Sequence, residues 1–172
     1  MEIVKENALV EDPYVDASAA DAVLPATGPV IVSLERWQKE RDALLGRGAP
    51  LGLKLRSDQS PEQVAADVQS FALIALEFPK FRDGRAYSYA RLLRERYGFR
   101  GELRAVGEVL LEQLFFMLRT GFDAFDIRAA DPLAAYRTAV ADFSVWYQPT
   151  GDGRPTAVEL RHRTQLNRKE PA

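Results

Sequence analysis

The chain contains no cysteine among its 172 residues, and it contains a single histidine, His162. Without cysteine it can form no disulfide, thiolate nucleophile or thiol redox pair, and it offers no thiolate to an iron–sulfur cluster or a haem. One histidine in a polar stretch is also too few for a histidine-based zinc site or a catalytic triad. We therefore expect no iron–sulfur, haem-thiolate or zinc site in this chain. Any redox chemistry would need an organic cofactor, whose identity stays open, or a partner protein.

Long apolar runs and an excess of positive charge are also absent. The longest apolar stretch, residues 109–118, is interrupted by Glu112 and Gln113, and it is shorter than the roughly 18 residues that a membrane span needs. The first residues lack the basic start and apolar stretch of a signal peptide. We therefore expect a cytoplasmic protein with no membrane partner. The net charge of −2 argues against a nucleic-acid partner, because dedicated nucleic-acid-binding proteins usually carry a strong basic excess.

The composition is typical of a folded globular protein, with 47% hydrophobic and 28% charged residues. Its length suits one compact domain with a tail. We predict an irregular N-terminal arm in residues 1–29, in which the short apolar pieces at residues 3–4 and 9–10 form a small hairpin or an extended arm. We expect the α/β domain in residues 30–150, and an edge strand followed by a basic tail in residues 151–172.

Strand-like and helix-like segments alternate along the expected domain. Apolar runs predict strands at residues 29–34, 51–55, 72–78, 102–106, 124–127, 144–150 and 156–160. Helical spacing and capping signals predict helices at residues 33–45, 60–71, 85–97, 109–120 and 131–143. Repeated βα units indicate parallel strands with right-handed crossovers. We therefore predict an α/β fold with a mostly parallel sheet flanked by helices, Rossmann-like or flavodoxin-like with three layers. A partial βα-barrel is the alternative, because the βα units repeat so regularly.

The segment at residues 109–120 is apolar around most of its helical circumference. We expect it to be covered on several sides within the fold. The alternative is an exposed face that binds a second copy of the chain or another partner.

Positively charged residues gather in the loop that joins the strand at residues 72–78 to the helix after it. These residues are Lys80, Arg82 and Arg85. Ligands of open parallel sheets bind beyond the carboxyl ends of the strands, and the free N–H groups at a helix start favour an anion. We therefore predict that the three cations bind an oxyanion such as sulfite, sulfate or a phosphate group. The alternative is that Asp83 caps the helix and the cations are solvated.

Further polar residues near this rim are candidates for supporting roles. Glu77 ends its strand and is a candidate general base. Arg104 and Asp126 lie in neighbouring expected strands, where an ion pair between them is conceivable. No catalytic motif is found, and the glycines at residues 46–52 follow a helix and enter a strand, which is the wrong context for a dinucleotide-binding loop. The supporting candidates are Glu77, Asp83, Ser88, Arg91 and Arg104.

Residues 77–125, EFPKFRDGRAYSYARLLRERYGFRGELRAVGEVLLEQLFFMLRTGFDAF, resemble the core signature of the bacterial domain of unknown function 934 family. The resemblance also extends over most of the chain, including VSLERW and LGLKLRS. It rests on Phe78-Pro79, Phe81, Asp83-Gly84-Arg85, Ser88, Ala90-Arg91, Gly101-Glu102-Leu103-Arg104-Ala105 and Gly107. Members of the family often carry the label of an oxidoreductase involved in sulfite reduction, and the family is associated with sulfite reductase genes.

The resemblance implies a role in assimilatory sulfate and sulfite reduction, in one of three forms. The first is an accessory protein that acts with a sulfite reductase component. The second is an oxidoreductase or oxyanion-binding enzyme of the same pathway with a non-covalent cofactor. The third is a structural or regulatory protein labelled only from its gene position. The missing cysteines agree better with an accessory protein than with the catalytic haemoprotein.

Overall fold

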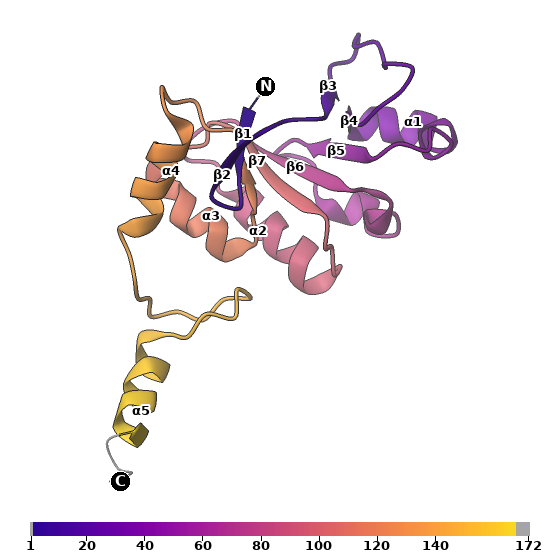
Figure 1. Ribbon diagram of the computed structural model, residues 1–172. Coiled ribbons are helices and arrows are strands. Elements are labelled where there is room, and N and C mark those ends of the chain that lie inside the picture. Colours follow the sequence, from indigo (N-terminus) through magenta and orange to yellow (C-terminus); the bar gives the residue numbers. More distant parts are fainter. Residues whose placement is uncertain (1, 168–172) are drawn as a thin grey trace.

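The structure, a computed structural model, describes residues 2–167 and is built on one eight-stranded sheet. Its strands are β1 (Glu2–Lys5), β2 (Ala8–Glu11), β3 (Val15–Ala17), β4 (Val30–Ser33), β5 (Leu51–Leu55), β6 (Leu73–Phe78), β7 (Glu102–Gly107) and β8 (Ala124–Phe125). Its α-helices are α1 (Leu34–Leu45), α2 (Arg85–Arg91), α3 (Leu114–Thr120), α4 (Pro132–Ala141) and α5 (Ala157–Asn167) (Figure 1). Shorter helical turns are η1 (Pro61–Val64), η2 (Val68–Ser70), the π-helical η3 (Leu92–Arg96) and η4 (Leu111–Gln113).

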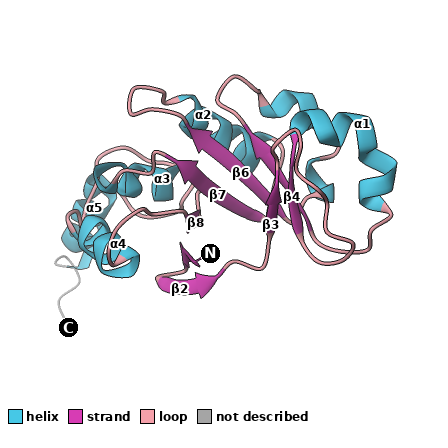
Figure 2. Cartoon of the chain, turned by 90° about the horizontal axis from the view of Figure 1, so that it is seen from above, coloured by secondary structure: helices cyan, strands magenta, loops and turns pink. Residues whose placement is uncertain are grey.

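The strand order shows which of the two expected architectures the sheet adopts. The order is β2-β1-β8-β7-β6-β5-β4-β3, so β3 to β8 lie side by side in chain order, and each of these pairs is parallel. A doubly wound three-layer sheet would instead reverse its order at a switch point. The predicted α/β class with a mostly parallel sheet is confirmed, and it takes the partial βα-barrel form, a curled half-barrel flanked by helices (Figure 2).

The two faces of the sheet differ in what covers them. On β6, Ile74 and Leu76 belong to the main core, together with Trp37 of α1 and residues of α2 and α3. The alternate residues Leu73 and Ala75 face the other way and belong to a small separate cluster. This alternation follows from the two-residue period of a strand. We call the face opposite the main core the inner face.

The N-terminal arm is part of the sheet. The hairpin expected from residues 3–4 and 9–10 is confirmed as β1 and β2. The prediction of an irregular arm is wrong for most of residues 2–17, because β1 pairs with β8 and β3 pairs with β4. These pairings use backbone groups of β8 and β4 that would otherwise be free at sheet edges. Between β2 and β3, residues 12–14 cross the inner face, and we call this segment the strap.

The connection between β5 and β6 is less helical than expected. The predicted helix at residues 60–71 is instead two short turns, η1 and η2. The helical path is interrupted at Asp67, which has φ −108° and ψ 3°, and whose carboxylate lies 2.6 Å from Nη2 of Arg41 on α1. Val64 and Val68, which recur at helical spacing in this segment, nevertheless lie in the main core.

The C-terminal part departs most from the predictions. Residues 144–150 and 156–160 are not strands. The edge beside β8 is already taken by β1, and Trp146 packs on Phe115 with ring centroids 5.6 Å apart. Residues 157–160 begin α5, because Thr156 and Glu159 form a reciprocal capping box. Helix α5 lies away from the sheet (Figure 1). The end of the predicted basic tail, residues 168–172, lies outside the described residues.

The segment at residues 109–120 is largely buried within the fold, as predicted. Leu114 and Met117 are fully buried, whereas Phe116 and Leu111 are 57% and 40% exposed. In the part of the chain that the structure describes, no helix is long and apolar enough to cross a bilayer.

Candidate functional site

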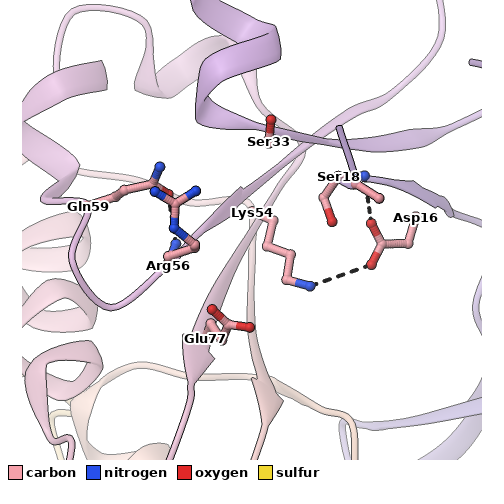
Figure 3. Close-up of a pocket in the computed structure, with 8 residues that line it drawn as sticks. Asp16, Ser18, Ser33, Lys54, Arg56, Gln59 and Glu77 are labelled. Carbon is pink, nitrogen blue, oxygen red and sulfur yellow. Dashed lines mark hydrogen bonds and ion pairs between the residues drawn. The ribbon is translucent and has the colours of Figure 1, made fainter. Parts of the chain in front are cut away.

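A cavity of about 430 Å³ opens on the inner face, at the carboxyl ends of β3 to β6 (Figure 3). We call it the inner pocket. This end of the parallel strands is where ligands of βα-barrels bind. The inner pocket is lined by Asp16, Ser18, Ala19, Ser33, Lys54, Arg56, Gln59 and Glu77.

Strand alternation places the charged side chains of the inner pocket. Lys54 lies between Leu53 and Leu55, which both face the main core, so its own side chain points to the inner face. Glu77 is placed in the same way on β6, between two core residues. The residues that point into the inner pocket are thus the polar ones in otherwise apolar strands.

Lys54 and Glu77 are only loosely engaged. The Nζ atom of Lys54 lies 3.7 Å from Oδ2 of Asp16, which is longer than a hydrogen bond. Glu77 is half-buried, and its carboxylate makes no hydrogen bond or ion pair with the residues that the structure describes. Figure 3 shows the Glu77 carboxylate and the Lys54 side chain directed toward the same space. Both groups therefore keep bonding capacity for a ligand.

Arg56 and Gln59 form a more rigid wall. Nη1 of Arg56 lies 2.7 Å from Oε1 of Glu35, and its Nε donates to Asp58 at 3.2 Å. Gln59 donates to the same Glu35 oxygen at 2.9 Å and accepts from the Arg56 backbone N–H at 2.9 Å. The Arg56 guanidinium lowers the pKa of Glu35, so this carboxylate stays ionised and holds the wall in place.

Ser33 brings the start of α1 to the inner pocket. Its hydroxyl accepts a hydrogen bond from the Arg36 backbone N–H at 3.2 Å and caps the helix. A second cavity of about 450 Å³ shares Ser18, Ala19, Ser33 and Arg56 with the inner pocket and extends along α1. The two cavities therefore meet at these four residues.

The predicted anion ligands lie in the loop after β6. The side chains of Lys80 and Arg82 are exposed and make no hydrogen bond or ion pair with the part of the chain that the structure describes. Arg85 is held in place: its Nε and Nη2 donate to the Asp83 carboxylate at 2.9 and 2.6 Å, and Nη2 also donates to Ser57 Oγ at 3.1 Å. The Arg85 guanidinium keeps the pKa of Asp83 well below its usual range. Anion binding by the three cations stays a prediction.

The supporting candidates do not share one site. Glu77 lies in the inner pocket and Asp83 binds Arg85. Ser88 and Arg91 are exposed on the outer surface of α2, where Arg91 pairs with Glu95 at 3.1 Å. Asp83 Oδ1 also accepts from the Arg85 backbone N–H at 3.3 Å, so it contacts the start of α2 as the alternative interpretation suggested.

Arg104 lies beneath the strap and belongs to a buried charge network. Its Nη1 donates to Asp12 at 2.6 Å and its Nε donates to Glu102 at 2.8 Å, while Lys5 donates to the second Glu102 oxygen at 2.8 Å. Burial alone would lower the pKa of Arg104, but the two carboxylates outweigh burial and raise it. The suggested pairing with Asp126 is wrong, because the register of β8 places Ala124 opposite Arg104.

The sequence patterns missed several residues of the inner pocket. Lys54 was treated as part of a strand, although one lysine between two buried leucines is a signal for an inward polar side chain. Asp16 and Ser33 reach the inner pocket only through strand pairing. Across residues 2–167 no group of three or more histidine, aspartate or glutamate side chains is arranged to hold a metal ion.

Comparison with protein families gives one informative match. A family model described as "Bacterial protein of unknown function (DUF934)" matches residues 52–158. The matched region contains Lys54, Glu77 and the loop with Arg85, whereas Asp16 and Ser33 precede it. The chain matches none of the curated proteins with which it was compared.

Proposed function

Because the chain belongs to the DUF934 family, we propose that it is an accessory protein of assimilatory sulfate and sulfite reduction and acts with a sulfite reductase component. The pathway is suggested by the resemblance of residues 77–125 to family members labelled for sulfite reduction. The absence of cysteine supports an accessory role, because the chain cannot itself supply thiolate ligands to an iron–sulfur cluster or haem.

The observation that carries this proposal is the exposed tip of the loop after β6. We call residues 80–82 the basic tip. Phe81 is 56% exposed and stands between two cations whose charged groups have no partner in the described part of the chain. Arginine and aromatic side chains are enriched at the centres of protein interfaces. The Asp83–Arg85–Ser57 contacts fix the base of the loop, which lowers the cost of ordering the tip on a partner. The basic tip therefore suits an acidic surface on a partner protein.

Affinity purification of the tagged chain from its native bacterium tests the proposal. We expect sulfite reductase subunits to co-purify, and Lys80→Glu/Arg82→Glu to reduce their recovery by at least about tenfold, because the two reversed charges oppose an acidic partner. The matched control is Arg96→Glu/Arg100→Glu, which makes the same charge change on exposed residues elsewhere.

Three outcomes contradict the proposal. The first is no recovery of sulfite reductase with the wild type. The second is recovery with the tip variant at the level of the control variant. The third is normal growth of a deletion strain on sulfate as the sole sulfur source.

The second candidate is an oxidoreductase or oxyanion-binding enzyme of the same pathway. This candidate is favoured by the cations that gather along the carboxyl edge of the sheet. Arg85 donates a hydrogen bond to Ser57, which follows Arg56 in the chain, so both arginines belong to this edge. An absorption spectrum of the freshly purified protein tests for a bound flavin-like chromophore. Sulfite or sulfate should raise the melting temperature beyond an ionic-strength control, and Arg85→Met should abolish the rise. A featureless spectrum together with no such rise contradicts this candidate.

A further inference from the structure

The inner pocket combines both charge signs around one cavity. Arg56 is bound on two sides by Glu35 and Asp58. Lys54, in contrast, stands 3.7 Å from its nearest carboxylate oxygen, on Asp16. The Glu77 carboxylate has no hydrogen bond or ion pair within the described chain. The pocket therefore presents one ammonium and one carboxylate whose bonds to the protein are incomplete.

This mixture disfavours ligands of a single charge sign. A sulfate or phosphate at Lys54 would lie in the same cavity as the carboxylates of Asp16 and Glu77. A simple cation at Glu77 would share the cavity with Lys54 and Arg56. Like charges repel strongly at such short range in a partly desolvated site. A ligand that carries both signs satisfies both halves of the pocket.

The strand register orients such a ligand. Ser33 and Lys54 are direct partners across β4 and β5, and Ser33 caps the twelve-residue helix α1. The start of α1 therefore borders the pocket beside the strand position of Lys54, and the positive end of its helix dipole and the Lys54 ammonium both favour a carboxylate. Glu77 reaches the pocket from β6, on the other side of Lys54 (Figure 3). An ammonium group of the ligand is favoured there.

The size of the site suits a small molecule. A cavity of about 430 Å³ lies within the usual range of ligand pockets. The adjoining cavity of about 450 Å³ shares four lining residues and leaves room for a ligand side chain. We propose that the inner pocket binds a free α-amino acid, with its carboxylate at Lys54 and the start of α1 and its ammonium at Glu77. This binding goes beyond the proposed accessory role and requires neither the basic tip nor a partner protein.

Thermal-shift screening followed by calorimetry on the full chain tests the inference. The probes are the standard α-amino acids, tested one at a time. We expect at least one of them to raise the melting temperature in a saturable way. Lys54→Met and Glu77→Gln should each weaken its binding by at least about tenfold, because each removes one charge contact. The matched controls Arg96→Met and Glu95→Gln, on exposed side chains outside the pocket, should bind it like the wild type.

Simple probes separate the alternatives. Sulfate and acetate carry only negative charge, methylammonium carries only positive charge, and glucose carries none. The inference is overturned if no amino acid binds, or if any of these probes binds as tightly as the best amino acid. It is also overturned if a folded Lys54→Met or Glu77→Gln variant, checked by circular dichroism, keeps wild-type affinity. A failure of co-purification with sulfite reductase would leave this result untouched, so the two proposals fail independently.

Discussion

Arg104 and Asp12 form an ion pair beneath the strap, with 2.6 Å between Nη1 and Oδ2 and side chains that are 1% and 4% exposed. The two residues are 92 positions apart in sequence. Tyr14 lies over the same guanidinium, with its ring centroid 5.7 Å from the Arg104 Cζ atom. The pair therefore fastens the strap to the middle of the sheet.

Removing one partner of this pair is expected to be costly. Asp12→Ala should lower the free energy of unfolding by about 3 kcal/mol or more, because it leaves a buried guanidinium with only Glu102 as its counter-charge. Urea denaturation measures the loss. Glu95→Ala, which breaks the exposed pair with Arg91, should cost less than about 1 kcal/mol. Equal losses in the two variants would show that the strap contact contributes no more than a surface pair.

The Asp83–Arg85 contact predicts a pH-dependent stability. The pKa of Asp83 is depressed in the folded state by Arg85, from an ordinary value near 3.8. Its contribution is therefore fully present well above the ordinary pKa and is lost progressively as the pH falls from there through the folded-state pKa. Asp83→Asn should be less stable than the wild type at pH 7, and the difference should shrink in the acid range. A difference that stays constant down to pH 2 would contradict this assignment.

Local backbone chemistry is the part of the fold that could be predicted. The sequence repeats Gly98-Phe99 and Gly121-Phe122 at two helix ends. Both glycines have left-handed backbone, with φ of +63° and +109°, and both phenylalanines are buried. The capping signals that predicted the helices at residues 33–45 and 131–143 are equally local, since Ser33 and Asp131 accept hydrogen bonds from N–H groups three residues away. Such signals are contained within a few adjacent residues.

Non-local pairing is the part that could not be predicted. Nothing near Lys5 in the sequence indicates that β1 pairs with β8, or that Lys5 reaches Glu102. The same holds for the inner pocket. Glu77 was recognised because it ends an apolar strand, whereas Asp16 joins the inner pocket only because β3 pairs with β4. The two-residue period of a strand shows that successive side chains lie on opposite faces of the sheet, but it does not show which distant residue each of them contacts.

Gly107 is expected to tolerate no side chain. It has φ +91°, and a Cβ atom there would lie 2.5 Å from the Phe78 carbonyl oxygen. Gly107→Ala should therefore destabilise the protein by more than the ~1–2 kcal/mol that a left-handed non-glycine residue costs by itself. Gly48→Ala is the matched control, because Gly48 has φ +67° and nothing within 4 Å of its Cβ position. Thermal unfolding of both variants checks the order, and a smaller loss at Gly107 would refute it.

The capping box of α5 gives a prediction about local order. Thr156 donates its backbone N–H to Glu159 at 2.6 Å, and the Glu159 N–H is 3.4 Å from Thr156 Oγ1. Thr156→Ala should speed amide hydrogen exchange in residues 157–160, because the helix loses its N-cap. Thr138→Ala on α4 is the control, since that hydroxyl bonds back to a carbonyl within its own helix. Unchanged exchange in residues 157–160 would show that α5 does not depend on the cap.

The pairing of Lys5 with Ala124 also bears on how the chain folds while a ribosome makes it. Synthesis runs from the N-terminus, so β1 and the strap leave the ribosome well before β7 and β8 exist. Contacts between residues so distant in sequence form slowly. Until β7 has been made, Asp12 of the strap has no Arg104 to bind, so the strap cannot take its place on the inner face. β1 and the strap, although made before β7 and β8, are therefore expected to reach their final places only after them.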